Sequence, residues 1–257
     1  MELASYSIEL LSLLFLTAVI AGLLDTMAGG GGLITVPALI LCGLPPLAAL
    51  ATNKLQASMG TATATYLMFK NKRIGWHRVK WLMLSAFIGS GIGTVFVQFI
   101  DVAVLTFVIP AALLLVGMYF LFSPSLGEDL SRAKVTEKTY RRAIVSSIGS
   151  YDGMFGPGTG SFYAVAGVVF RGHGLIESTA IAKSLNFATN IASLIVFIVA
   201  GHVVWMLGGL MMGGQMIGAW LGSHFLFKIR PQYLRLIVVA MCFGMLARYG
   251  YQMEWFY

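Results

Sequence analysis

Four ionisable side chains lie within otherwise apolar stretches of the sequence: Asp25, Lys54, Asp152 and Lys183. A charged group inside a bilayer costs several kcal/mol unless it is paired or hydrated, so each of these residues is a candidate for a functional role. Polar side chains accompany both lysines at the spacing of one helical stripe. The stripe carries Asn53, Gln56 and Gly60 in the first half of the chain and Lys183, Asn186 and Asn190 in the second. Ammonium and amide groups together favour a small anion as the ligand.

Other interpretations of these charged residues stay open. The lysines could extend toward the membrane surface, or form structural ion pairs with Asp25 or Asp152. The aspartates could neutralise the lysines when no substrate is bound, or carry a proton that couples transport. Tyr151, Ser161 and Tyr163 are further candidate hydrogen-bond donors.

Two glycine-rich runs, at 29–32 and 156–160, occupy equivalent places in the two halves of the chain. Consecutive glycines do not hold a helix, and Pro157 removes a backbone donor. Each half is therefore predicted to open with two shortened helices that meet at an unwound turn, the second helix beginning near Leu33 or Ser161. The free N–H groups and positive dipole end of that helix can bind an anion. Alternatively, the glycines only permit close helix packing.

The predicted substrate-binding groups combine the glycine turns with the polar stripes: Gly30, Gly31, Gly32, Asn53, Lys54, Gln56, Gly158, Gly160, Ser161, Lys183, Asn186 and Asn190. Asp25 and Asp152 are expected to balance charge or to couple protons. We expect no catalytic residue and no cofactor. We also expect no metal site, because the four histidines are dispersed and neither cysteine has a ligand partner nearby in sequence.

The composition places these residues in a membrane protein. Of the 257 residues, 58% are apolar and only 11% are charged, and the mean hydropathy is +0.84. Soluble domains are about 25% charged, and disordered chains are poor in the large aliphatic residues that dominate here. The run 184–227 contains 44 residues without Asp, Glu, Lys or Arg. We therefore predict an all-α protein with about eight to ten membrane segments at ~20 residues per span.

The positive charges predict how these segments are oriented. The segments are expected at 8–25, 32–43, 46–69, 79–99, 103–123, 138–152, 160–171, 174–199, 204–226 and 232–253. Fourteen of the 17 Lys and Arg residues fall in alternate connections, at 70–80, 125–142, near 172 and near 230. The positive-inside rule places these connections in the cytoplasm and both termini outside. The basic pI of 9.5 then reflects topology and gives no reason to expect a nucleic-acid partner.

Sequence motifs recur at a nearly constant offset of 126 to 130 residues. One pair is Gly22-Leu-Leu-Asp25-Thr-Met27 and Gly149-Ser-Tyr-Asp152-Gly-Met154, and the spacing Gly89-x-x-x-Gly93 returns as Gly218-x-x-x-Gly222. Each half holds five predicted segments, an odd number, so the two repeats are expected to be inverted, with the substrate near the midplane between them. The corresponding domains are 1–124, a cytoplasmic linker 125–137, and 138–257.

The motifs at 25–32 (DTMAGGGG), 51–56 (ATNKLQ) and 151–156 (YDGMFG) resemble the TauE/SafE family of sulfite and organosulfonate exporters. Ser161-Phe-Tyr163 matches the second repeat motif as well. The likeness covers nearly the whole chain and is greatest to permeases of that family from enteric bacteria. It implies a permease of the bacterial inner membrane whose partners are the lipid bilayer and a small anion, with sulfite, sulfonates, other sulfur-containing organic acids or carboxylates as candidates.

Two other functions compete with anion transport. An anion channel could share the same fold and site. An intramembrane aspartyl protease would use paired aspartates for acid–base chemistry. Asp25 is not preceded by Gly-x-Gly, the Gly-x-Gly-Asp context of such enzymes, and lysines are expected near both aspartates, so we expect no enzyme activity. The sequence contains no recognisable ATP-binding domain, so a secondary transporter is predicted.

Overall fold

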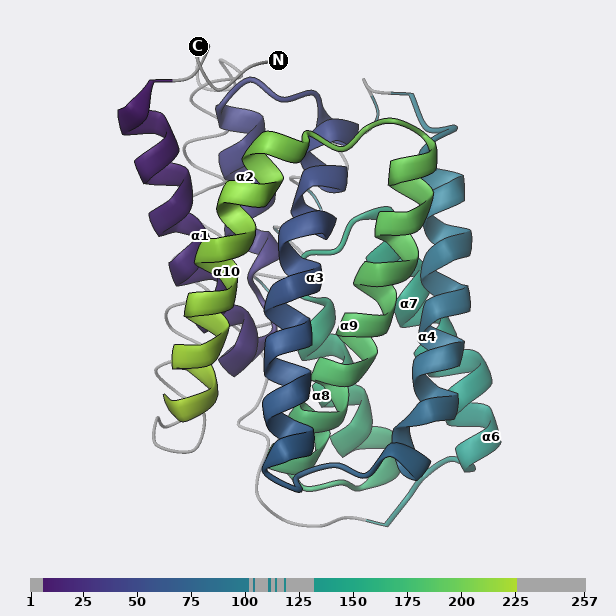
Figure 1. Cartoon of the computed structure of the whole chain (residues 1–257). Helices are drawn as coiled ribbons and strands as arrows, with labels where there is room; N and C mark the ends of the chain where they lie inside the picture. Colours follow the sequence, from purple (N-terminus) through teal and green to yellow (C-terminus); the bar gives the residue numbers. More distant parts are fainter. Residues whose placement is uncertain are drawn as a thin grey trace.

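The computed structural model describes residues 7–101 and 132–225, together with the single positions 104, 111, 114 and 118. Every regular element within these residues is helical (Figure 1). The elements are α1 (Ile8–Ala28), α2 (Gly32–Leu41), α3 (Pro46–Lys70), α4 (Trp76–Val97), α6 (Glu137–Thr139), the π-helical turn η2 (Tyr140–Val145), α7 (Ser146–Met154), α8 (Thr159–Arg171), α9 (Leu175–Val199) and α10 (Trp205–Phe225). The prediction of an all-α protein is confirmed for this part of the chain.

Eight of the ten predicted segments correspond to these helices, with ends that agree to within three residues. The predicted segment 103–123 is described only at its four single positions, and 232–253 lies outside the described residues. Three described helices are long and apolar enough to cross a membrane, at Ile8–Met27, Trp76–Val97 and Ile176–Val199.

The lengths of α1 and α2 correct one prediction. Both helices beside the first glycine turn were expected to be short, but α1 has 21 residues and reaches spanning length, because the helix continues past Asp25 and ends only at Gly29. The 10 residues of α2 rise only about 15 Å, half of a ~30 Å hydrocarbon core. The 13 residues of α8 reach about 20 Å. The break therefore shortens the helix that follows each turn.

The helices α3 and α9 lie side by side at the centre of the molecule (Figure 1). On one side, α10 packs against both α3 and α1; on the other, α4 packs against both α9 and α7. Each outer pair thus joins a helix from the first half of the chain to one from the second. The polar residues of α3 and α9 are consequently enclosed by other helices.

The connections are sorted to opposite ends of this bundle. The α3–α4 and α8–α9 connections lie at one end, and the α2–α3 and α9–α10 connections lie at the other (Figure 1). Arg78, which follows the first connection, forms an ion pair with Glu177, which follows the second. The described basic connections 70–80 and 171–173 therefore share one end, while the connections near 44 and 202, which contain no Lys or Arg, share the other.

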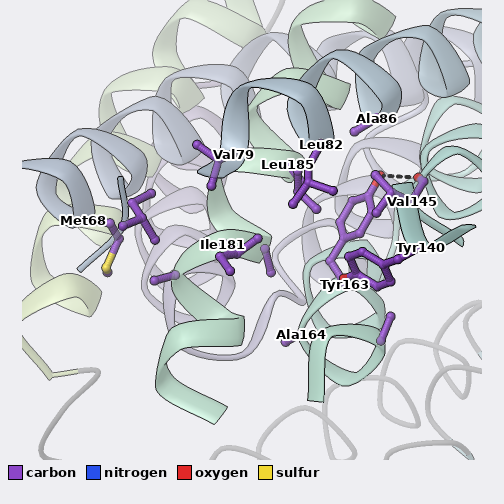
Figure 2. Packing of buried hydrophobic residues seen from close by; sticks show 14 residues of the cluster. Met68, Val79, Leu82, Ala86, Tyr140, Val145, Tyr163, Ala164, Ile181 and Leu185 are labelled. Atoms are coloured by element: carbon purple, nitrogen blue, oxygen red, sulfur yellow. Dashed lines mark hydrogen bonds between the residues drawn. The ribbon is translucent and has the colours of Figure 1, made fainter. Parts of the chain in front are cut away.

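An apolar cluster fills the bundle at the basic end. It draws side chains from α3, α4, η2, α8 and α9, including Met68, Leu82, Val145, Ile181 and Leu185 (Figure 2). The hydroxyl of Tyr163 in this cluster donates to the backbone carbonyl of Val145 at 3.2 Å. The cluster closes this end of the bundle around a tyrosine whose polar atom is satisfied.

Small residues allow α4 and α7 to pack with their backbones in contact. A Cβ added at Gly93 would come within 2.8 Å of the Ser150 carbonyl carbon, and one added at Gly89 would lie 3.0 Å from that of Ser146. Ser150 Oγ also donates to the Gly89 carbonyl at 3.1 Å. Such close approach is the usual basis of helix association in membranes, where apolar burial alone provides little driving force.

We expect Gly93→Ala to lower the free energy of unfolding by about 1–3 kcal/mol, because the added methyl forces the backbones of α4 and α7 apart. Gly91→Ala is the matched control on the same helix, since nothing lies within 4 Å of its Cβ position. It should be neutral, or stabilising by up to about 1 kcal/mol. Unfolding by SDS in mixed micelles measures both, and equal effects of the two substitutions would contradict this packing.

Candidate functional site

The first glycine turn links α1 to α2 and carries the carboxylate of Asp25. Gly29 ends α1 in the left-handed conformation (φ +78°), and its N–H donates to the Asp25 carbonyl at 2.7 Å. The Asp25 side chain reaches across the turn, where its Oδ1 accepts from the Gly31 N–H at 3.2 Å. One of the amides predicted to bind a substrate anion is thus bound to the protein's own carboxylate.

The second turn links α7 to α8 and contains two glycines with positive φ. Gly156 (φ +88°) and Gly158 (φ +78°) flank Pro157, and α8 begins at Thr159. The Tyr151 hydroxyl donates to the Pro157 carbonyl at 2.8 Å and braces the turn from α7. Glycine adopts positive φ with little strain, so these two glycines allow the chain to leave the helix here.

The two glycine turns lie directly against each other. A Cβ added at Gly160 would lie 2.7 Å from the Gly29 Cα, so the backbones are in contact there. Gly32, the first residue of α2, lies close to Pro157, with 3.6 Å between its Cβ position and the Pro157 Cα. The first residues of α2 and α8 are therefore brought together from opposite halves of the chain.

Lys54, on α3, is buried at the second turn. Its Nζ lies 3.0 Å from Asp152 Oδ1, and its side chain is 2% exposed. A Cβ added at Gly156 would lie 3.3 Å from the same Nζ. Asp152 Oδ2 has no hydrogen-bond partner among the described residues. The ammonium of the first half is therefore neutralised by a carboxylate of the second half, which keeps one oxygen unsatisfied.

Lys183, on α9, is buried where the two turns meet. Its Nζ donates to the backbone carbonyl of Asp25 and lies 3.9 Å from Asp25 Oδ2. The Cβ position of Gly160 lies 3.3 Å from this Nζ. The pairing of Lys54 with Asp152 is thus mirrored by a lysine of the second half with an aspartate of the first. Both lysines are buried and paired, so neither extends to the membrane surface.

The polar stripe of α3 is bonded mainly within the first half. Asn53 Oδ1 accepts from Thr35 Oγ1 at 2.5 Å and from Gln56 Nε2 at 3.2 Å. Gln56 Oε1 is buried without a partner in the described part of the chain. Thr35 was not singled out from the sequence, although it is the one polar residue of α2. A lone hydroxyl in an apolar segment was the signal that could have identified it.

The stripe of α9 reaches the turns only in part. Asn186 and Asn190 are both buried, and Asn190 Nδ2 lies 3.5 Å from Thr61 Oγ1 on α3. Thr61 is seven residues beyond Lys54, about 10 Å along the helix, so this contact lies away from the glycine turns. Tyr163, a candidate donor at the second turn, instead donates to Val145 in the apolar cluster.

The backbone amides of α8 are also engaged. The Ser161 N–H donates to the Gly158 carbonyl at 3.0 Å, and the Thr159 N–H donates to the Gly156 carbonyl at 3.3 Å. The expected set of free amides at the start of this helix is therefore reduced by short-range bonds within the turn. Charged side chains, more than free amides, dominate the site in this structure.

A family model for the sulfite exporter TauE/SafE matches residues 14–249. The chain belongs to the TauE/SafE family. It is 38% identical over 250 residues to a probable membrane transporter protein of Haemophilus influenzae, covering 97% of this chain and 98% of the relative. It is 39% identical over 242 residues to the probable membrane transporter protein YfcA of Escherichia coli K12, covering 94% of this chain and 90% of the relative. No solved structure matches the chain.

Membership of this family accounts for the composition and the helices of the chain. TauE/SafE proteins are membrane transporters, so the chain is a bacterial membrane permease that handles a small substrate. The family also implies transport and not enzymatic catalysis, which disfavours the protease alternative. Both buried ion pairs and both glycine turns lie within the matched residues.

Breaking one buried ion pair should cost more than removing both of its members. We expect Asp152→Asn to destabilise the protein by about 3–5 kcal/mol, because it leaves the buried Lys54 ammonium without a counter-charge. The double variant Lys54→Met/Asp152→Asn should recover part of this loss, with an interaction free energy of about 1–3 kcal/mol. SDS unfolding of the wild type, the two single variants and the double variant measures this interaction free energy.

Lys70→Met provides the matched control, because Lys70 lies on the same helix, α3, at its basic end. Combined with Asp152→Asn, it should give additive losses of stability. Additive losses in the Lys54 cycle as well would show that the pair makes no energetic contribution.

Proposed function

We propose that this transporter is a secondary carrier of small organic or sulfur-containing anions of the sulfite and sulfonate type. The observation that carries the proposal is the pair of buried lysines, Lys54 and Lys183, held at two apposed glycine turns by aspartates of the opposite half. An anion that displaces a carboxylate gains an ammonium already desolvated and positioned, which reduces the cost of binding.

The substrate site is proposed to lie between the turns and the central helices, near the bilayer midplane. Its groups are those predicted from the sequence: Gly30, Gly31, Gly32, Asn53, Lys54, Gln56, Gly158, Gly160, Ser161, Lys183, Asn186 and Asn190. The short α2 and α8, whose first residues meet at the turns, support this location. Asn190 is the outermost member, since its amide contacts Thr61.

The charge balance suggests how substrate and proton are coupled. Two lysines and two aspartates carry no net charge together, so an anion that enters alone leaves the site with excess negative charge. A proton taken up by Asp152 at its unsatisfied Oδ2 would release Lys54 to the anion and restore neutrality. The aspartates then neutralise the lysines in the empty state and carry the coupling proton in the loaded state.

The two halves are proposed to be inverted repeats, 1–124 and 138–257, joined by the cytoplasmic linker 125–137. The packing supports this, because α1 with α10 and α7 with α4 are equivalent pairs when the halves are exchanged. The helices α3 and α9 are equivalent to each other in the two halves, so their central contact is unchanged by the same exchange. In the bacterial inner membrane, the positive-inside rule would place the basic end in the cytoplasm and both termini in the periplasm.

Flux into proteoliposomes tests the substrate class and the lysine site together. We expect saturable uptake of sulfite or small sulfonates that responds to an imposed proton gradient. Lys54→Met and Lys183→Met should each reduce it roughly tenfold or more, because each removes a charge-assisted contact. Lys70→Met should leave flux unchanged. Normal flux in both buried-lysine variants would refute the site, and flux without saturation or counterflow would indicate a channel.

Cysteine labelling tests the orientation. Cys42 and Cys242 are first replaced by serine, and Asn71→Cys and Ala200→Cys then place single thiols at exposed positions at opposite ends of the bundle. In spheroplasts, an impermeant maleimide should label position 200 directly, and position 71 only after the membrane is permeabilised. The reverse pattern would overturn the assigned topology.

A further inference from the structure

A cavity of about 320 Å³ opens at the basic end of the bundle, outside the site described above. Among the residues that the structure describes, three cationic side chains line it, Lys72, Arg73 and Arg78, and one carboxylate, Glu177. Its apolar wall includes Phe69 and Ile181. A concave site with apolar walls and an excess of one charge concentrates counter-ions of the opposite sign.

The Arg78–Glu177 ion pair spans the two helices that begin at this cavity. Arg78 lies in the first turn of α4, and Glu177 lies in the first turn of α9. Their side chains are 53% and 34% exposed, so water screens the pair and it holds weakly. A guanidinium at the positive end of a helix dipole is also unfavourably placed unless an anion accompanies it. An anion from solution can therefore replace Glu177 at low cost.

The neighbouring His173 contacts Arg78 but adds no competing positive charge beside it. Arg78 Nη2 lies 3.2 Å from His173 Nε2. Burial and the adjacent guanidinium lower the pKa of His173, so the ring is neutral near pH 7 and accepts from Arg78 without competing for an anion. The positive charge of the described cavity lining therefore comes from Lys72, Arg73 and Arg78 and not from His173.

The cavity lies on the same helix as the buried lysine of α9, nearer its basic end. Glu177 and Lys183 are six residues apart, about 9 Å along the helix and about 120° around it. Ile181 lines the cavity and also belongs to the apolar cluster with Met68 and Leu185, which closes this end of the bundle (Figure 2). The apolar cluster therefore adjoins the cavity, whereas Lys183 lies further along α9 and faces Asp25.

We propose that this cavity is a second anion site, an entrance site for small oxyanions at the basic end, in which Arg78 exchanges Glu177 for the incoming anion. The transport role of this site rests on the proposed function, whereas anion binding to it does not. In this proposal the anion binds next to the apolar cluster before it moves to the central site at Lys183.

Trp76 provides a local reporter of binding. Its ring lies 6.3 Å from that of Phe69, which lines the cavity. Titration of the purified full-length protein with sulfate, at constant ionic strength set with chloride, should give a saturable change in fluorescence that is lost in Trp76→Phe. Arg78→Gln should weaken binding about tenfold, since it removes a charge-assisted hydrogen bond. Glu177→Gln should strengthen binding severalfold, because the competing carboxylate is gone.

Lys80→Gln is the matched control, because Lys80 lies on α4 but does not line the cavity. It should leave sulfate binding unchanged. Equal losses of sulfate affinity in Arg78→Gln and Lys80→Gln would indicate a general effect of surface charge and would overturn the proposal. Unaltered binding in Arg78→Gln, or weaker binding in Glu177→Gln, would also overturn it.

The two proposals fail in different measurements. The sulfate titration should persist in Lys54→Met, whose substitution lies at the central turns, even though flux is lost. A wild-type protein that binds sulfate at this cavity but transports no anion would refute the proposed function alone. Flux that depends on Lys54 without any Trp76 signal would refute the entrance site alone. In flux assays from the basic side, Arg78→Gln should raise KM with little change in kcat.

Discussion

The cost of a buried charge is the constraint on which the rest of this structure depends. Two lysines lie buried inside the helical bundle, and each is tolerated only because an oxygen of the opposite half reaches it. Lys54 has the carboxylate of Asp152, and Lys183 has the carbonyl and, at longer range, the carboxylate of Asp25. These crossed contacts tie the two halves together at the place where the helices are broken.

Bringing those groups together requires backbones that approach more closely than side chains normally permit. Gly29 and Gly160 let the two turns touch, and Gly93 brings α7, which carries Asp152, against α4. The glycines therefore serve both of the roles considered for them: some break helices and others allow close packing. The short-range bonds within the turns leave fewer free amides, so the lysines carry most of the positive potential in the site.

The unequal partners of the two lysines have a cause in the sequence. Under the repeat alignment Lys183 corresponds to Asn53 and not to Lys54, a difference of one residue and about 100° around a helix. Lys54 consequently meets a side-chain carboxylate directly, whereas Lys183 meets first the main-chain carbonyl of Asp25. If transport is coupled through an aspartate, this asymmetry favours Asp152, which has an unsatisfied oxygen.

Composition, charge spacing and glycine runs were sufficient to predict the helical class, most helix ends and the four buried ionisable residues, because these follow from local chemistry and the cost of charge in lipid. The partner of each lysine was decided only by the tertiary structure, since both aspartates fit the sequence equally well. The tertiary structure also decided the full length of α1, the hydrogen bond from Tyr163 to Val145 and the contact between Asn190 and Thr61. Helical periodicity gives the face on which a residue lies, but packing between helices determines which residue it meets.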